Sequence, residues 1–329
     1  MQINTYNPVF NAAYDEIVKK LDICGVVPLV HIEDKRNALP LAGALMSADI
    51  TAAEITFRTS CADEVIRTLS SRCPRLAVGA GTVINVKQVQ AAVAAGAKYI
   101  VTPAFNPDVV DRCIEMGIPV FPGCSTATDI DQAYSRGLRV VKFFPSELLG
   151  GVRMLKALGG PYPFMKFIPT GGINLNNLTD YLSCNQVLCC AGTFIAGREN
   201  LDAQNFAEIT RIARAAVDKV LSLRLEGVSV PASDDQNASD VMKSISRLAG
   251  INHDKNEKSV FGMSATVTSD KTLRGTVVYS SPNLERCLYY LGNRGFPEDK
   301  VKTVKEGSRL TEITLVEQIG HFEIKIIKR

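Results

Sequence analysis

One lysine of this sequence lies inside an apolar run. Residues 139–151 read RVVKFFPSELLGG, which places Lys142 between two valines and two phenylalanines. If the run is a β-strand, Lys142 shares one face with Val140 and Phe144, and burial of that face partly desolvates its ammonium. Desolvation favours the neutral amine, which attacks carbonyl carbons. The structural alternative is a lysine that reaches out of the strand end or pairs with a carboxylate.

A glutamate occupies a comparable position. Glu54 lies among apolar residues near the end of the run 52–57, AAEITF. A buried lysine and glutamate either form an ion pair or together supply a Schiff-base nucleophile and a proton-transfer group. Arg58 follows four residues later and offers a guanidinium fork that matches a substrate carboxylate. The three residue types together favour chemistry on a keto acid.

The elements that must hold these residues follow from the spacing of apolar runs. Short runs rich in β-branched residues alternate with longer segments of helical period. The runs cover residues 25–32, 52–57, 76–80, 98–102, 118–123, 139–144, 165–170 and 186–192. Spacings of roughly 20 to 25 residues fit right-handed βαβ units, and eight units predict a closed parallel (β/α)8 TIM barrel. An open doubly wound sheet is the alternative.

In a barrel of this kind the chemistry lies where strands end and βα-loops begin. Several predicted strands end in polar or glycine-rich residues, among them TGGI at 170–173 and AGTF at 191–194. Glycine lets a ligand approach the backbone, and adjacent amide donors suit a phosphate. Because these loops follow the seventh and eighth strands, where such barrels often bind phosphate, we predict a phosphate site there.

The first 215 or so residues resemble the 2-keto-3-deoxy-6-phosphogluconate (KDPG) aldolase family, whose members often also cleave 4-hydroxy-2-oxoglutarate. The resemblance rests on the motifs VVPLV, EITFRT, GAGTV, TPAFNP, PGCSTATD, KFFPSE, PTGGI and the small-residue run near Gly192. It implies a class I (Schiff-base) aldolase, a lyase of carbohydrate metabolism in the Entner-Doudoroff pathway. Such an enzyme cleaves KDPG to pyruvate and glyceraldehyde 3-phosphate, and 4-hydroxy-2-oxoglutarate to pyruvate and glyoxylate. The alternative is a catalytically inactive barrel that binds metabolites or acts as a scaffold.

The resemblance also implies a role for each site residue. Lys142 forms the imine with the keto acid, and Glu54 moves protons. Arg58 and Thr82 hold the keto-acid carboxylate. The residues implied around the phosphate are Thr170, Gly171, Gly172, Gly192 and Thr193. Members of the family need no metal or other cofactor and commonly form homotrimers, so the expected partners are a small-molecule keto acid and two further copies of the chain.

Two departures from the family pattern bear on the substrate. Many relatives have GGS in the phosphate run, whereas this sequence has Ala191-Gly192-Thr193, which retains a hydroxyl but adds a methyl group. His31 stands where relatives have an apolar or basic residue. We interpret His31 as a hydrogen-bonded strand-end histidine, with substrate contact as the alternative. These departures leave the implied imine chemistry intact, and they bear on phosphate affinity and hence on the preferred substrate.

The C-terminal part follows a different pattern. We predict an aldolase barrel over residues 1–225, a polar linker over 226–240 and a smaller α+β domain over 241–329. Within that domain, residues 274–329 have a βαβββ order and resemble one module of the glyoxalase-like (vicinal oxygen chelate) superfamily. Its first strand has no histidine or carboxylate, which leaves His321 and Glu323 as isolated metal candidates and favours a noncatalytic packing or ligand-sensing module.

Composition supports a cytoplasmic metabolic protein. The chain has 329 residues, 46% hydrophobic content and a formal charge of +3, so it carries no charge excess that favours nucleic acid or a membrane surface. No basic, then apolar, leader opens the sequence, and no apolar run reaches the roughly 20 residues of a membrane span. The nine cysteines and three histidines lack the spacing of a zinc site or a disulfide framework, so we predict no metal.

Overall fold

The chain divides into two compact units in a computed structural model that describes residues 7–248, 259, 262–270 and 272–329. The first unit ends at Val220 and the second comprises Leu221–Arg329. The boundary therefore lies a few residues before the one predicted at 225. Among the described residues, no helix is both long enough and apolar enough to cross a membrane.

The first unit contains eight short parallel strands, one for each apolar run of the sequence. They are β1 (Val26–Val30), β2 (Ala52–Thr56), β3 (Ala77–Gly81), β4 (Tyr99–Val101), β5 (Val120–Phe121), β6 (Val140–Phe143), β7 (Lys166–Pro169) and β8 (Cys190–Gly192). The strands pair in the order β5-β4-β3-β2-β1-β8, and β6 pairs with β7. Parallel bridges from Gly123 to Lys142 and from Thr170 to Ala191 join the two sets. The sheet is thus closed, which confirms the barrel and excludes the open doubly wound alternative.

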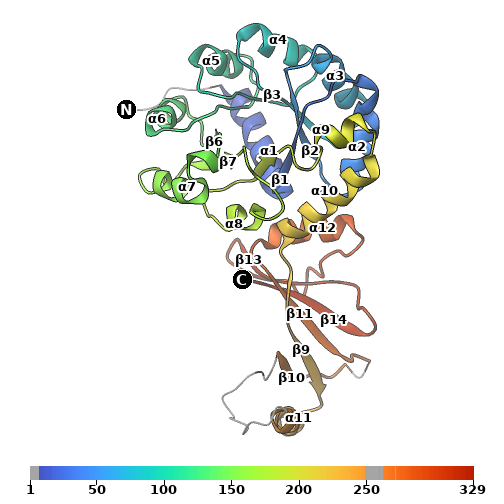
Figure 1. Cartoon of the computed structure of the whole chain (residues 1–329). Helices are drawn as coiled ribbons and strands as arrows, with labels where there is room; N and C mark the ends of the chain where they lie inside the picture. Colours follow the sequence, from blue (N-terminus) through green and yellow to red (C-terminus); the bar gives the residue numbers. More distant parts are fainter. Residues whose placement is uncertain (1–6, 249–258, 260–261, 271) are drawn as a thin grey trace. The chain divides into compact units, whose positions relative to one another are not determined.

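Helices surround the barrel strands (Figure 1). They are α1 (Pro8–Cys24), α2 (Ala38–Met46), α3 (Ala62–Arg72), α4 (Val86–Ala94), α5 (Pro107–Glu115), α6 (Ala127–Ser135), α7 (Gly151–Gly159), α8 (Leu178–Leu182), α9 (Arg198–Asp202) and α10 (Phe206–Leu221), with 3-10 turns η1 (Lys35–Asn37) and η2 (Glu147–Leu149). Side-chain caps fix where several helices begin. Asn106 accepts from the backbone of α5, and Thr126 forms a capping box with Asp129 at the start of α6.

Helix α1 precedes the first strand and was not predicted. Asn7 caps its start, and its last turn ends at Gly25, whose φ of 70° is left-handed. The next residue begins β1, so this glycine turns the chain directly from the helix into the barrel. Tyr14 of α1 accepts a hydrogen bond from the backbone nitrogen of Val140 at 2.9 Å, which ties the helix to β6.

In the residues that the structure describes, the second unit is a six-stranded sheet with two helices. Its elements are β9 (Arg224–Ala232), α11 (Asp235–Leu248), β10 (Met263–Val267), β11 (Gly275–Ser281), α12 (Leu284–Asn293), β12 (Val304–Glu306), β13 (Arg309–Thr314) and β14 (Phe322–Lys328). The sheet order is β10-β9-β11-β14-β13-β12, with β11 and β14 parallel. The βαβββ order predicted over 274–329 is present. The start of the strand expected at 259–268 lies partly outside the described residues.

The predicted linker over residues 226–240 is wrong. Most of this segment forms β9 and the first turns of α11. Strand β9 is only partly buried and is held by ladders to β10 and β11, so its own sequence shows little apolar periodicity. The polar residues after it act as a cap, because the Asp234 carboxylate accepts from the backbone nitrogen of Asn237 at 2.7 Å. Polarity here reflects a half-exposed strand and a helix start.

Candidate active site

Lys142 is buried at the C-terminal end of β6. Its residue surface is 4% exposed, and its backbone is fixed on both sides by hydrogen bonds to the chain after β5: its N–H donates to Pro122 at 2.9 Å and its carbonyl accepts from Cys124 at 2.8 Å. The Nζ atom lies 3.5 Å from Oε1 of Glu54, and 5.5 Å from the centre of the Phe144 ring. The amine therefore faces the barrel interior beside a carboxylate and does not reach out to solvent.

Glu54 approaches Lys142 from β2, across the barrel. Its side chain is 3% exposed, so the pair is isolated from bulk water. Gly81, at the end of the neighbouring strand β3, provides the space for this carboxylate, because a Cβ there would lie 2.0 Å from Glu54 Oε1. Gly79 makes the same kind of room for the ring of Tyr99, whose hydroxyl donates to the carbonyl of Ala53 at 3.0 Å. Burial raises the pKa of Tyr99, with a further contribution from the charge of Glu54.

A cavity of about 380 Å³ opens at this end of the barrel. Lys142 lies in its wall, and Glu54 contacts Lys142 from behind that wall. The structure brings the other predicted residues to the same cavity, namely Arg58, Thr82, Thr170, Gly171, Gly172, Gly192 and Thr193. Apolar residues that were not predicted complete the lining: Leu29, Pro103, Phe144 and Ile173. A buried lysine, a guanidinium and several small loops thus share one enclosure of ligand size.

Thr82 has a strained backbone at this site. Its φ is 58°, in the left-handed region that a β-branched residue rarely adopts. Such strain persists only where neighbouring structure imposes it, and it is often found at ligand sites. The residue follows directly after Gly81, so the turn that places Thr82 in the cavity wall begins where β3 makes room for Glu54.

The loop after β7 is held by a partly buried hydrogen-bond network. Gly171 and Gly172 both have left-handed backbones, with φ of 93° and 84°. The N–H of Glu147 donates to the carbonyl of Gly171 at 3.1 Å, and a Cβ on Gly172 would lie 2.6 Å from the Cβ of Glu147. The hydroxyl of Tyr181 donates to the Glu147 carboxylate and accepts from Ser146 Oγ at 2.9 Å. Burial raises the pKa of Tyr181, and its bond to Glu147 raises it further, so the phenol remains a donor.

The two departures noted in the sequence have clear locations. His31 contacts the hydroxyl of Thr56 through Nδ1 at 3.3 Å and the carboxylate of Glu33 through Nε2 at 3.2 Å. It is not among the described residues that line the cavity. This arrangement matches the hydrogen-bonded strand-end interpretation. Ala191 is 1% exposed on β8, so its added methyl group is packed in the barrel wall next to Gly192.

Comparison with known proteins assigns the first unit to a protein family. A family model described as KDPG and KHG aldolase matches residues 15–212, more than half of the chain. The chain belongs to the KDPG and KHG aldolase family. It is 43% identical over 204 residues to the 2-dehydro-3-deoxy-phosphogluconate aldolase of Treponema pallidum, an alignment that covers 62% of this chain and 97% of the relative. The KHG/KDPG aldolase of Escherichia coli is 37% identical over 193 residues, with coverage of 59% and 91%.

Solved aldolase structures share the barrel. The KDPG aldolase of Legionella pneumophila, with pyruvate captured as a covalent carbinolamine intermediate, is 34% identical at a TM-score of 0.59 and covers 60% of this chain and 97% of its own. The 2-keto-3-deoxy-6-phosphogluconate aldolase of Zymomonas mobilis, with 3-phosphoglycerate, is 33% identical at a TM-score of 0.57, with coverage of 62% and 95%. These comparisons confirm the family resemblance found in the sequence. The glyoxalase-like resemblance of the second unit stays a prediction.

Proposed function

We propose that this chain is a class I aldolase that cleaves KDPG to pyruvate and glyceraldehyde 3-phosphate, and 4-hydroxy-2-oxoglutarate to pyruvate and glyoxylate. The observation that carries the proposal is the buried pair of Lys142 and Glu54, with 3.5 Å between Nζ and Oε1, at the cavity. The captured pyruvate adduct named for the Legionella pneumophila relative supports the same chemistry. An inactive scaffold would not need this pair beside an open ligand cavity.

The chemistry begins at Lys142. Its neutral amine attacks the C2 carbonyl carbon of the keto acid, and loss of water from the carbinolamine leaves an imine. The protonated imine accepts electrons, so the C3–C4 bond breaks when a base removes the proton of the C4 hydroxyl. Glu54 is the group placed for that transfer, directly or through one water. The aldehyde leaves, the enamine takes a proton at C3, and hydrolysis of the imine releases pyruvate and restores the amine.

Substrate binding is assigned to the rest of the cavity. Arg58 and Thr82 hold the keto-acid carboxylate, for which a guanidinium is suited by its bidentate geometry. The phosphate lies against the loops after β7 and β8, where Thr170, Gly171, Gly172, Gly192 and Thr193 offer hydroxyl and backbone donors. The 3-phosphoglycerate named for the Zymomonas mobilis structure supports a site for phosphorylated three-carbon ligands in this family.

Reduction with borohydride in the presence of pyruvate tests the proposal. The reduced imine should add mass to the peptide that contains Lys142, and Lys142→Ala should abolish both the label and pyruvate release from KDPG. Lys166→Ala is the matched control, because Lys166 lies on the next strand but is exposed. Label at another lysine, or unchanged labelling in Lys142→Ala, would contradict the assignment. Full labelling without release of pyruvate from either substrate would favour a metabolite-binding protein.

We further propose that the enzyme acts in the cytoplasm as a homotrimer, as the family resemblance implies. Light scattering coupled to size exclusion measures the oligomer directly. A mass near three times the 35.7 kDa of one chain is expected. A monomer with full activity would show that the active site is complete in one chain and that the trimer is dispensable.

A further inference from the structure

The second unit contains a cavity of about 150 Å³ that the aldolase reaction does not use. The cavity lies on the sheet face opposite helix α12. Cys287 of α12 is hydrogen-bonded to Ser281 of β11, so the odd-numbered residues of β11 face the helix. Thr276 therefore points the other way, and so does Glu323, which pairs with it across β11 and β14.

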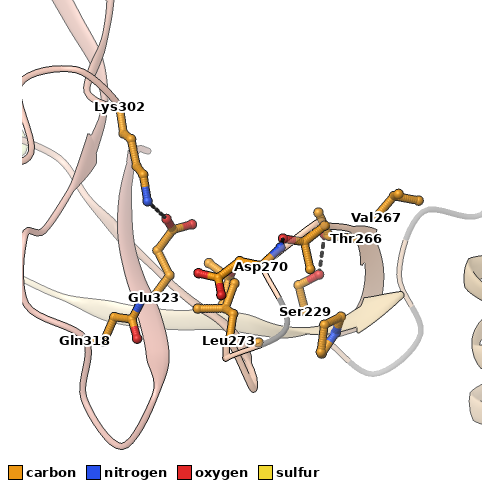
Figure 2. A pocket seen from close by; sticks show the side chains of 12 residues that line it. Ser229, Thr266, Val267, Asp270, Leu273, Lys302, Gln318 and Glu323 are labelled. Atoms are coloured by element: carbon orange, nitrogen blue, oxygen red, sulfur yellow. Dashed lines mark hydrogen bonds and ion pairs between the residues drawn. The ribbon is translucent and has the colours of Figure 1, made fainter. Parts of the chain in front are cut away.

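Polar side chains form a row along this face. Thr276 pairs with Ser229 on β9 as well as with Glu323 on β14, so three neighbouring strands each contribute one polar side chain. Ser229 shares a hydrogen bond with Thr266 of β10, which extends the row to a fourth strand. Figure 2 shows Ser229, Thr266 and Glu323 around the cavity together with Asp270 and Lys302.

Several of these side chains have donors or acceptors that hydrogen bonds within the described residues do not use. The Glu323 carboxylate, with 15% of its side chain exposed, accepts from Lys302 at 2.8 Å through Oε1. Asp270 accepts from the backbone and hydroxyl of Thr272 through Oδ1. Within the described part of the chain, Oε1 is the only Glu323 oxygen that accepts a hydrogen bond. Thr276 is only 8% exposed, and within the described part of the chain its hydroxyl has no hydrogen-bond partner. Asp270 is exposed, whereas Thr276 and Glu323 lie on the sheet, and all three line the cavity, so their remaining hydrogen-bonding capacity is open to a ligand or to water.

The charges of the lining indicate what kind of ligand fits. Asp270 and Glu323 carry two negative charges, and Lys302 carries one positive charge, so the cavity disfavours a phosphate or a carboxylate. A divalent cation usually takes several anionic ligands, whereas no group of three or more His, Cys, Asp or Glu side chains suited to a metal occurs among the described residues. A simple ammonium ion would compete with Lys302 for Glu323. A hydroxyl group both donates and accepts, so it matches carboxylates, an ammonium and a threonine hydroxyl together.

We propose that this cavity binds a small uncharged polyol, a sugar or sugar alcohol, through Glu323, Asp270, Lys302 and Thr276. Neighbouring hydroxyls of the ligand donate to the two carboxylates and accept from Lys302 and Thr276. Pro231, Val267 and Leu273 contact its carbon atoms. The proposal does not depend on aldolase activity, because every lining residue belongs to the second unit.

Calorimetric titration of the full chain with glycerol, D-xylose and D-glucose tests the proposal. Titrations use the Lys142→Ala variant alongside the wild type, so that binding in the barrel is separated from binding in the second unit. At least one uncharged probe should bind both chains saturably. Glu323→Gln should weaken that binding by about tenfold or more, as expected for loss of a hydrogen bond to a charged group, and Thr276→Val should weaken it less. Glu306→Gln, on the exposed strand β12, is the matched control and should leave binding unchanged.

Sodium D-gluconate and calcium chloride serve as charged comparisons. Tighter Glu323-dependent binding of gluconate would overturn the proposal in favour of an anion site, and the same result with calcium would indicate a cation site. The proposal is also wrong if none of the three uncharged probes binds, or if neither Glu323→Gln nor Thr276→Val changes the affinity while circular dichroism shows both variants folded.

Discussion

Gly81→Ala should disable Glu54, the carboxylate proposed for proton transfer, without touching Lys142, the proposed nucleophile. The backbone of Gly81 is not left-handed, so alanine is allowed there, and the obstacle is the Glu54 side chain. The new Cβ would lie 2.0 Å from Glu54 Oε1 and 2.6 Å from Cδ and Cγ. The carboxylate would have to withdraw by more than about 1 Å to reach an ordinary van der Waals distance. That movement breaks its present geometry with Lys142, which is already 3.5 Å away.

The expected cost follows from the role of Glu54. A displacement of about 1 Å in a reacting group reduces rates on the order of 10²-fold, and loss of a general acid or base costs 10² to 10⁴-fold. We therefore expect kcat for KDPG cleavage to fall about 10²-fold in Gly81→Ala, and at least as much in Glu54→Gln. Borohydride labelling of Lys142 with pyruvate should persist in both variants, because the amine itself is unchanged.

Steady-state release of pyruvate from KDPG is the assay, and two comparisons make it decisive. Gly43→Ala is the control for a glycine change, since a Cβ on Gly43 meets nothing within 4 Å, and it should keep wild-type activity. The double variant Gly81→Ala/Glu54→Gln should be no slower than Glu54→Gln alone, because both changes act on one group. Normal turnover by Gly81→Ala, or full additivity in the double variant, would refute the reasoning.

Three further predictions concern the loops and the second unit. Tyr181→Phe removes the hydrogen bond that holds Glu147 beside the Gly171 loop, so KM for KDPG should rise about tenfold while KM for unphosphorylated 4-hydroxy-2-oxoglutarate changes little; equal changes for both substrates would contradict a phosphate-loop role. Thr82→Gly relieves a left-handed backbone, so the free energy of unfolding in denaturant titration should stay the same or rise by up to about 1 kcal/mol, while KM for both keto acids increases. A chain ending after Leu221 keeps all of α10 and every proposed active-site residue, so it should retain pyruvate labelling and KDPG cleavage; a folded, labelled but inactive product would show that the second unit contributes to catalysis.

Much of the barrel and its cavity was predictable from local sequence. Each β-strand of a closed parallel barrel is buried on both sides, so it appears as an apolar run, and the eight runs matched the eight strands. The alternation of side chains along residues 139–144 predicted which face of the strand Lys142 occupies. The position of polar and glycine residues at strand ends predicted which loops meet at the cavity, because all strands of a parallel barrel end on the same side. The KDPG aldolase motifs reinforced this prediction.

The second unit was less predictable because its strands are not buried on both faces. Strand β9 is a half-exposed segment whose stability comes from pairing with β10 and β11, and that pairing leaves no mark on local periodicity. The polar run 226–240 therefore looked like a linker. The row of Ser229, Thr276 and Glu323 arises from cross-strand register, which joins residues almost a hundred positions apart.

The sequence by itself determined the residue types, the strand periodicity and the family of this protein. Tertiary structure alone decided the distances: Lys142 and Glu54 are 88 positions apart in the chain and meet at 3.5 Å only because the barrel closes. It also decided that Gly81 is the space that Glu54 occupies, since a glycine in sequence does not reveal which neighbour uses its missing side chain. Local patterns depend on how each residue meets its own strand or helix, whereas contacts across a barrel depend on how all the strands pack together.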